Sequence, residues 1–496
     1  MDFLSKHGYV EALREYLRTP GKTYLGICIG MQVLFESSTE SPGVEGLGVI
    51  KGAIERFPAG ESDPSVPQIG WNGLVVKQPS SMFASLQPTD RVYFVHSYRA
   101  KATGDNERWV ASTTRYGADD YISAVQSGTV AAVQFHPEKS GTVGLTLIKN
   151  FLARTAPQHL SATPAVAPTL SRRVVACLDV RTNDEGDLVV TKGDSYDVRE
   201  ASESAAKKGR VRNLGKPVEL AKRYYDDGAD EITFLNITSY RGEPLEDSPL
   251  LALLEEASKN IFVPLTIGGG IRDYEDAQGR KYTALQVADR YFRAGADKVS
   301  IGGDAVLAAE RLLGGAPMDG TSCIEQISKA YGAQAVVISV DPKRVYLDSS
   351  EAERDAKQQG RTVVDAADVR PGAAPGARCK VWYQCTIKGG REARPLDAVQ
   401  LCQMCERLGA GEILLNSIDM DGQKKGFDGD LIDAVAACTR LPIIASSGAG
   451  AAQHFVDVFQ STRAEAALAA GMFHRKEVAI GDVKRVMVDA GLPVRQ

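Results

Sequence analysis

A cysteine at the tip of a short glycine-flanked turn is the first residue of this chain whose setting favours covalent chemistry. The turn GICIG, residues 26–30, follows the strand-like residues 23–25 and precedes a helical stretch, 31–36. Strand, sharp turn and helix in this order are typical of a nucleophile elbow, here with Cys in place of Ser. A helix N-terminus lowers the pKa of a thiol, and the Ile29 amide is placed to donate to an oxyanion. The pattern predicts that Cys28 is a nucleophile; the alternative is a buried, inert thiol.

A nucleophilic cysteine needs a base, and the motif QFHPEKS provides one. It contains His136 and Glu138 and follows the strand-like residues 130–133. We expect His136 to take the thiol proton and Glu138 to orient and stabilise the imidazolium. His96, in FVHSY, is the rival base, but it has no acidic neighbour in the sequence, so we interpret it as structural or as lying beside the substrate.

Two aspartates in the second part of the chain end similar apolar runs. Asp179 ends VVACLD and Asp341 ends VVISVD. A carboxylate at the end of a buried strand is costly unless it is paired or takes part in chemistry. Either aspartate alone has an alternative role as the cap of the following helix. Because the two runs resemble each other, we expect the pair to act as general acid and general base, with pKa values separated by different surroundings.

Glycine-rich turns near the same strand ends predict anion pockets. Glycine lets backbone N–H groups approach phosphate oxygens, and helix N-termini add a favourable dipole. Matching turns in the two halves favour a substrate with a phosphate at each end. Lys192-Gly193, after VVT, is placed to close over such a substrate, unless it is an ordinary solvated loop lysine. The other candidate binding residues are Gly268, Gly269, Gly302, Gly303, Ser447, Gly448, Ala470 and Gly471.

Alternating short strands and helices must position these residues, which indicates parallel βα units. Eight of them predict an α/β fold that contains a (β/α)8 TIM barrel, with active-site residues at the C-terminal ends of its strands. Charged or Pro-Gly-rich insertions follow the first strand (195–215) and the fifth (346–380). The eight predicted strands are 174–180, 231–236, 263–268, 298–302, 335–341, 412–417, 441–446 and 466–470.

Domain boundaries follow from composition and from an internal repeat. Residues 155–171 are rich in Ala, Pro, Ser and Thr and lack an apolar period, so they predict a linker between domains 1–154 and 172–496. Within the second domain, strands 1, 3 and 4 resemble strands 5, 7 and 8. The barrel is therefore expected to consist of two related half-barrels.

Composition favours small-molecule chemistry. A net charge of −5 gives no reason to expect binding to nucleic acid or to a membrane, and no apolar run is long enough to span a bilayer. The pair Cys402-x-x-Cys405 lies in a predicted helix, 397–409, with no second pair or nearby His, so we interpret it as helix packing in a reducing compartment. No metal site and no cofactor is predicted.

These motifs resemble the imidazole glycerol phosphate synthases in their fused eukaryotic form. GICIGMQ and QFHPEKS are similar to motifs of class I (triad) glutamine amidotransferases, and ACLDV, VVTKGD, TIGGGIRD, ADKVSIG, ISVDPKR and IIASSGAG are similar to the cyclase barrel of histidine biosynthesis. The resemblance runs over essentially the whole chain, and motifs of this length are highly specific. It implies a class I amidotransferase domain followed by a cyclase barrel.

The resemblance also implies a reaction, that of a lyase coupled to a glutaminase. Cys28 hydrolyses glutamine through a thioester, with His136 and Glu138 assisting, and ammonia passes through the barrel core. At the far mouth it meets a phosphoribulosyl-formimino aminoimidazole carboxamide ribonucleotide, which carries two phosphates. Asp179 and Asp341 shuttle protons during cleavage and ring closure. The products are imidazole glycerol phosphate and an aminoimidazole carboxamide ribonucleotide.

Further residue roles are implied by the resemblance alone. Gln32 matches a glutamine contact and Lys192 a mobile-loop lysine, and a charged ring that gates ammonia matches Arg173, Glu231, Lys298 and Glu412. The resemblance also implies an N-terminally truncated glutaminase domain that lacks its first βα units, including a Pro-Gly-Val-Gly-type strand of the oxyanion hole.

Three alternatives to the full synthase remain open. Truncation of the glutaminase domain favours the same cyclase driven only by free ammonia. The second is the sister isomerase barrel of the same pathway, and the third is a non-catalytic binding protein that keeps the phosphate pockets.

The start MDFLSK has no signal-peptide or transit-peptide character, and the resemblance implies a soluble enzyme of the cytoplasm or plastid stroma.

Overall fold

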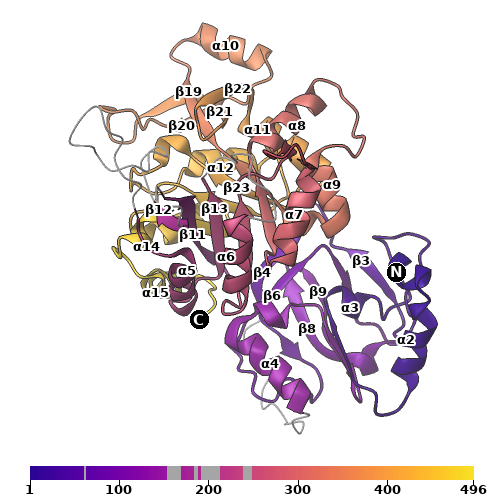
Figure 1. The fold of residues 1–496 in the computed structure, drawn as a ribbon. Coiled ribbons are helices and arrows are strands. Elements are labelled where there is room, and N and C mark those ends of the chain that lie inside the picture. Colours follow the sequence, from indigo (N-terminus) through magenta and orange to yellow (C-terminus); the bar gives the residue numbers. More distant parts are fainter. Residues whose placement is uncertain (61–62, 154–168, 184–187, 192–212, 238–247) are drawn as a thin grey trace. The chain divides into compact units, whose positions relative to one another are not determined.

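The structure is a computed structural model that describes residues 1–496 except 61–62, 154–168, 184–187, 192–212 and 238–247. It forms two compact units, Met1–Ser171 with Arg495–Gln496, and Arg172–Val494 (Figure 1). Within the ranges described, no helix combines the length and the apolar character needed to cross a membrane.

The first unit contains a five-stranded sheet in the order β1-β10-β9-β8-β5, so β1 is an edge strand in the described part of the chain. β1 pairs in parallel with β10, and the other pairs are antiparallel. Its elements are α1 (Asp2–Lys6), α2 (Tyr9–Arg18), β1 (Tyr24–Ile27), α3 (Ile29–Gln32), β2 (Ser37–Ser38), β3 (Ala53–Arg56), β4 (Gln68–Asn72), β5 (Val75–Val76), β6 (Val92–His96), β7 (Tyr98–Ala100), η1 (Glu107–Trp109), β8 (Val110–Tyr116), β9 (Asp119–Ser127), β10 (Val130–Val133), η2 (Pro137–Lys139) and α4 (Gly141–Ala153).

Both faces of this sheet are covered, because alternate residues of a strand point to opposite sides. Val110 and Ile122 pack with α2 and α3 on one face. Ala111 and Tyr121 pack with Leu147 of α4 on the other. The sheet therefore lies between helices, and the turn from β1 into α3 is held from both sides.

Eight parallel strands of the second unit close into a barrel, which confirms the predicted (β/α)8 fold. Their order is β11-β13-β14-β17-β18-β23-β24-β25, and β11 pairs with β25 to complete the ring, while β12 adds an antiparallel partner to β11. The strands are β11 (Arg173–Thr182), β12 (Leu188–Thr191), β13 (Glu231–Asn236), β14 (Leu265–Gly268), β17 (Lys298–Ile301), β18 (Val336–Val340), β23 (Glu412–Asn416), β24 (Ile443–Ser446) and β25 (Ala466–Ala469).

Helices alternate with these strands along the chain. A short hairpin of β15 (Tyr274–Glu275) and β16 (Lys281–Tyr282) follows β14. The helices are α5 (Pro217–Asp226), α6 (Pro249–Ser258), α7 (Ala284–Arg293), α8 (Gly303–Leu313), α9 (Cys323–Tyr331), η5 (Ala333–Ala335), α11 (Ala398–Leu408), η6 (Ile418–Met420), α12 (Gly429–Ala436), α13 (Ala452–Ser461), α14 (Gly471–His474) and α15 (Ile480–Asp489).

Two barrel strands begin two residues later than the sequence predicts. β14 begins at Leu265 and β24 at Ile443, each directly after a proline, Pro264 or Pro442. Proline has no backbone N–H to donate to a sheet, so the regular pairing starts after it. The two sites are equivalent in the predicted half-barrel repeat.

The predicted insertion after the fifth barrel strand lies within a small antiparallel sheet. Its strands are ordered β19-β21-β20, and β22 pairs with β21. In Figure 1 this sheet and α10 lie at one end of the barrel unit. The elements are β19 (Pro342–Tyr346), α10 (Ser350–Gln358), β20 (Val364–Ala367), β21 (Arg378–Ile387) and β22 (Glu392–Asp397).

Candidate active sites

Cys28 occupies a sharp turn between β1 and α3. Its φ of 49° lies in a region that residues other than glycine rarely adopt, and such strain is concentrated at functional sites. A Cβ on Gly26 would lie 2.5 Å from the carbonyl oxygen of Gly30, so a side chain there would force the turn open. The main chain is fixed further by a 2.8 Å hydrogen bond from the Cys28 N–H to the Val133 carbonyl. This geometry is that of a nucleophile elbow.

His136 and Glu138 lie together beside this turn. The Nδ1 atom of His136 is 2.7 Å from Oε1 of Glu138, and the same ring makes a hydrogen bond with the Cys28 thiol. The backbone of His136 is held at both ends: its N–H donates to the Tyr93 carbonyl at 2.8 Å, and the His136 carbonyl accepts a hydrogen bond from the Ser140 hydroxyl at 2.6 Å. The structure thus brings together all three residues predicted for the thiol chemistry.

Electrostatics around His136 favour its protonated form. Burial alone would lower the pKa of His136, but its hydrogen bonds and charge interactions with Cys28 and Glu138 raise it to about 10. Burial would raise the pKa of Glu138, and the hydrogen bond with His136 holds it below its usual value instead. The pair is therefore suited to hold a proton next to the Cys28 sulfur and to keep the imidazole in one orientation.

Replacing Glu138 with Gln is expected to slow glutamine hydrolysis roughly 100-fold or more, because a neutral amide does not stabilise the imidazolium and can hold the ring in the wrong tautomer. The pKa of His136 should fall, since Glu138 raises it in the native protein. Steady-state glutaminase assays and an NMR titration of the His136 ring measure the two effects. Glu107→Gln, at an exposed position of the same unit, is the matched control. An unchanged rate of glutamine hydrolysis in E138Q would exclude a role for Glu138 in that reaction.

Two side chains near Cys28 sharpen the sequence-based description. The Gln134 amide donates to the Cys28 sulfur at 3.4 Å and accepts a 3.1 Å hydrogen bond from Gln32. Gln134 was not among the predicted residues, although a fully buried amide at the end of β10 is the kind of feature that marks a site. His96 is buried among aromatic rings, which lowers its pKa to about 3, so it is neutral and unsuited to act as the base.

Asp179 and Asp341 stand at the same end of strands on opposite sides of the barrel. Asp179 lies near the C-terminal end of β11, and Asp341 directly follows β18, four strands away in the ring. Asp341 is held by Asn416 of β23, whose Nδ2 donates to its Oδ1 at 2.7 Å, and by the Ser339 hydroxyl at 3.5 Å. Asn416 was also missed by sequence reasoning.

Burial raises the pKa of Asp341. The hydrogen bonds from Asn416 and Ser339 oppose this rise, and the negative charge of Asp421 adds to it. Asp341 is therefore better suited to carry a proton than an ordinary surface carboxyl group. Asp179 is almost buried, with 9% of its surface exposed, so neither acid is a solvated surface charge.

The predicted glycine turns adopt matching conformations in the two half-barrels. Gly269 has a φ of 93° and Gly448 a φ of 95°. A Cβ at either would collide with a backbone oxygen, 2.2 Å from that of Asn236 or 2.0 Å from that of Gly426. Ser447 has a φ of 73° although it carries a side chain. Both positions therefore require glycine, because of the positive φ and because neighbouring backbone packs directly against each turn.

The remaining predicted binding residues lie at strand ends and helix starts. Gly268 ends β14, Gly302 and Gly303 begin α8, and Ala470 and Gly471 begin α14. Helix N-termini leave backbone N–H groups without intrahelical partners, which favours anions there. Lys192 and Gly193, predicted to close over the substrate, lie outside the residues that the structure describes.

The four residues of the expected gate form one buried ring of charges. Arg173 contacts Glu231 at 2.9 Å and Glu412 at 2.5 Å, and Lys298 contacts each of the same carboxylates at 2.6 Å. The Thr266 hydroxyl donates to Glu231 at 2.7 Å. Burial would raise the pKa of Glu412, but Arg173 and Lys298 hold it below its usual value. Each residue begins its strand, so the ring lies at the opposite end of the barrel from the two aspartates.

Cys402 and Cys405 are fully buried on α11, and burial raises the pKa of both thiols well above their ordinary value. No cluster of three or more His, Cys, Asp or Glu side chains suited to a metal occurs among the residues that can be described. The helix agrees with its predicted span, since Asp397 caps its N-terminus and Gly409 its C-terminus.

Comparison with known proteins assigns each unit to a family. A family model described as glutamine amidotransferase class I matches residues 5–155, and one described as histidine biosynthesis protein matches residues 173–479. The chloroplastic imidazole glycerol phosphate synthase hisHF of Arabidopsis thaliana is 52% identical over 495 residues, which cover 100% of this chain and 81% of the relative. Those of Emericella nidulans and Schizosaccharomyces pombe are 50% and 48% identical over 99% and 100% of this chain, and 89% and 90% of their own lengths.

A relative of the barrel alone exists as a separate subunit. The HisF subunit of imidazole glycerol phosphate synthase from Halobacterium salinarum is 37% identical over 66% of this chain and 98% of its own length. Two family matches in one chain, and hisHF relatives that align with nearly all of this chain, agree with the two units of the structure. The chain therefore belongs to the fused imidazole glycerol phosphate synthases of histidine biosynthesis, in which a class I glutamine amidotransferase and a cyclase barrel form one polypeptide.

Proposed function

We propose that this chain releases ammonia from glutamine at Cys28 and uses it at the barrel mouth to convert the bis-phosphorylated formimino ribonucleotide into imidazole glycerol phosphate and an aminoimidazole carboxamide ribonucleotide. The observation that carries the proposal is the contact of His136 with both Cys28 and Glu138, in a chain whose barrel also bears two strand-end aspartates. The proposed domains are 1–154 and 172–496, with 155–171 as linker.

Hydrolysis of glutamine begins with attack of the Cys28 sulfur on the side-chain carboxamide carbon. His136 then gives its proton to the departing nitrogen, so that ammonia leaves and a thioester remains on Cys28. The N–H of Ile29, the first residue of α3, is oriented with the other amides of that helix start and donates to the oxyanion. Water, activated by the now neutral imidazole, releases glutamate. Gln32 is proposed to contact the bound glutamine.

Ammonia is proposed to travel along the inside of the barrel. Inward positions alternate along each strand, so Thr233 and Ser300 share the interior face with the charged ring at their strand starts. Val175 and Leu414 belong to an apolar cluster on the same interior face. Neutral ammonia passes through such a lining more readily than ammonium does, because a charge there is strongly disfavoured. The ring of Arg173, Glu231, Lys298 and Glu412 is the proposed gate. It opens when one of these side chains moves out of the ring.

At the mouth, the two phosphates of the substrate are proposed to lie against the turns at Gly269 and Gly448. This places the reacting centre between Asp179 and Asp341. The raised pKa of Asp341 favours it as the proton donor to the leaving group, and Asp179 then acts as the base during ring closure. Lys192 is proposed to close over the bound substrate.

The proposed function is tested by measuring both products chromatographically with glutamine or with an ammonium salt at alkaline pH as the nitrogen source. We expect turnover with each, and efficient glutamine-dependent turnover would exclude the cyclase that uses only free ammonia. That alternative is favoured by the edge position of β1 in the described part of the chain and by the exposed side chains of Phe3, Tyr9 and Ile29. No product with either source would contradict the proposal as a whole.

The compartment is proposed to be the cytoplasm or the plastid stroma. The chloroplastic relative from Arabidopsis thaliana supports the second of these. The proposed partners are small molecules, glutamine and the ribonucleotide, and neither nucleic acid nor a membrane.

A further inference from the structure

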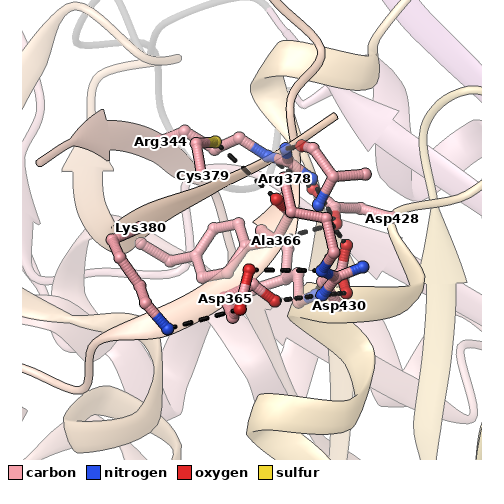
Figure 2. Close-up of polar contacts among 11 residues, drawn as sticks. Arg344, Asp365, Ala366, Arg378, Cys379, Lys380, Asp428 and Asp430 are labelled. Atoms are coloured by element: carbon pink, nitrogen blue, oxygen red, sulfur yellow. Dashed lines mark hydrogen bonds and ion pairs between the residues drawn. The ribbon is translucent and has the colours of Figure 1, made fainter. Parts of the chain in front are cut away.

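A buried ion pair joins the inserted sheet to the barrel loop after β23. Arg344 of β19 donates to Asp428 twice, from Nη2 at 2.7 Å and from Nε at 3.2 Å. Their side chains are only 2% and 1% exposed. Figure 2 shows this pair beside a second, more exposed set of contacts, in which Arg378 reaches Asp430 and Asp365.

Asp428 accepts hydrogen bonds from four residues at once. Besides the two from Arg344, it receives one from the Tyr383 hydroxyl at 3.1 Å, one from the Ser417 hydroxyl at 2.9 Å and one from the Leu431 N–H at 3.2 Å. Burial alone would lower the pKa of Arg344, but Asp428 raises it above its ordinary value. A buried carboxylate with this many donors has one position, so the segments that supply them are fixed relative to one another.

One of those segments leads directly to Asp341. Ser417 follows Asn416, whose amide donates to the Asp341 carboxylate at 2.7 Å. The backbone N–H of Arg344 also donates to Asp419, at 2.8 Å, two residues beyond Ser417. Arg344 therefore binds the loop after β23 at two points, Asp419 and Asp428. The two contacts fix the ends of the segment that lies between these residues.

The inserted sheet holds Asp341 from its other side. The carbonyl oxygen of Asp341 accepts hydrogen bonds from the Thr386 hydroxyl at 2.6 Å and from the Thr386 N–H at 3.2 Å. Thr386 lies on β21, the central strand of the insertion, and β21 pairs with β19, which carries Arg344. The main chain of Asp341 is thus fixed by the insertion and its carboxylate by Asn416, and the Arg344–Asp428 pair ties the two supports together.

We propose that the Arg344–Asp428 pair is a positioning device, which holds Asn416 against Asp341 and so fixes the carboxylate that transfers protons in the cyclase reaction. Arg344 acts through Asp428, Ser417 and Asn416 and does not itself reach the substrate. The inference rests on the proposed function of Asp341. It also gives the inserted β19–β22 sheet a part in the reaction, as the support of one proton-transferring group.

Among the described residues outside the ion pair, Asp421 and Cys385 are ionisable side chains with an electrostatic interaction with Asp341. Asp421, from the loop after β23, adds to the rise of its pKa. Cys385 of β21 is fully buried, and burial raises the pKa of its thiol, so it stays uncharged. Asp179 stands on the opposite strand of the barrel. The hydrogen bond from Asn416 lowers the pKa of Asp341, so a loosened Asn416 lets that pKa rise.

The test is Arg344→Met, assayed with an ammonium salt so that only the barrel reaction is measured. We expect kcat to fall roughly 10- to 100-fold, the range for small misplacement of a reacting group, with KM changed by less than about threefold. The limb of the pH profile of kcat that reports Asp341 should move to higher pH. A purely structural role would reduce the active fraction without moving that limb.

Arg378→Met is the matched control. Arg378 also links the insertion to the first turn of α12, through Asp430 at 3.0 Å, but half of its side chain is exposed. R378M should keep the wild-type kcat and pH profile. Arg344→Lys should fall between R344M and the wild type, because lysine keeps the charge but lacks the planar fork that donates twice to Asp428.

Ser417→Ala keeps the inference testable if R344M does not fold. The substitution removes only the hydroxyl that joins Asp428 to the neighbour of Asn416, and we expect a severalfold lower kcat and the same direction of pH shift. Wild-type kcat and pH profile in S417A, with Asp341→Asn inactive, would overturn the positioning role and leave the proposed function intact. An active D341N would instead remove Asp341 from the proposed function.

Discussion

Replacing Asp179 with Asn is expected to abolish formation of imidazole glycerol phosphate, with glutamine and with ammonium salts alike. Asn has nearly the same size but cannot accept and return a proton, and loss of a general acid or base costs roughly 10²- to 10⁴-fold. The decisive measurement is kcat for product formation with saturating ammonium, because the supply of ammonia does not then limit the cyclase rate. Glutamine hydrolysis at Cys28 should continue, since the two chemistries use different residues.

The fold should survive this substitution. Asp179 is 9% exposed at the end of a strand, and replacing a nearly buried carboxylate with a neutral amide lowers the cost of its burial. Thermal unfolding of D179N should therefore match or exceed that of the wild type. Asp457→Asn, at an exposed position of α13, is the control and should keep full cyclase activity. Cyclase activity in D179N within about tenfold of the wild type would exclude Asp179 as a proton-transferring group.

The barrel could be predicted from the sequence because its buried strands are runs of β-branched residues between glycine-rich turns. Those runs also predicted Asp179 and Asp341 at the C-terminal ends of strands, and in the structure Asp179 lies near the end of β11 and Asp341 directly follows β18. The hydrophobic pattern did not predict where β14 and β24 begin, since both start two residues later than expected. Hydrophobicity continues through Pro264 and Pro442, but regular pairing requires an N–H that proline lacks.

Contacts between distant segments account for what the sequence could not predict. The strands β19 and β21 pair Pro342 with Cys385, and nothing local in the intervening charged, Pro-Gly-containing residues indicates that pairing. Arg344 and Asp428 likewise become partners only through the fold. The roles of Gln134 and Asn416 could not be predicted, because an uncharged amide in a strand is not in itself a sign of a functional site. Each amide matters only through the neighbour that the fold places beside it, Cys28 or Asp341.

Replacing Cys28 with Ala should separate the two halves of the proposed reaction. Glutamine-dependent product formation is expected to fall at least about 10³-fold, because no other group can form the thioester, whereas ammonium-driven turnover should stay within about twofold of the wild type. Alanine keeps the Cβ, so the strained backbone at this position, with its φ of 49°, changes little. Cys323→Ala is the control, since burial raises the pKa of that thiol to about 12 and leaves it unreactive.

This substitution also decides between the synthase and the cyclase that uses only free ammonia. In the synthase, the Cys28 sulfur attacks glutamine and the adjacent His136 transfers the proton, so loss of the sulfur removes the whole glutamine-dependent rate. In the alternative there is no such rate to lose, and C28A and the wild type give the same low turnover with glutamine. Equal, high glutamine-dependent turnover in both would contradict either model, because it requires a nucleophile other than Cys28.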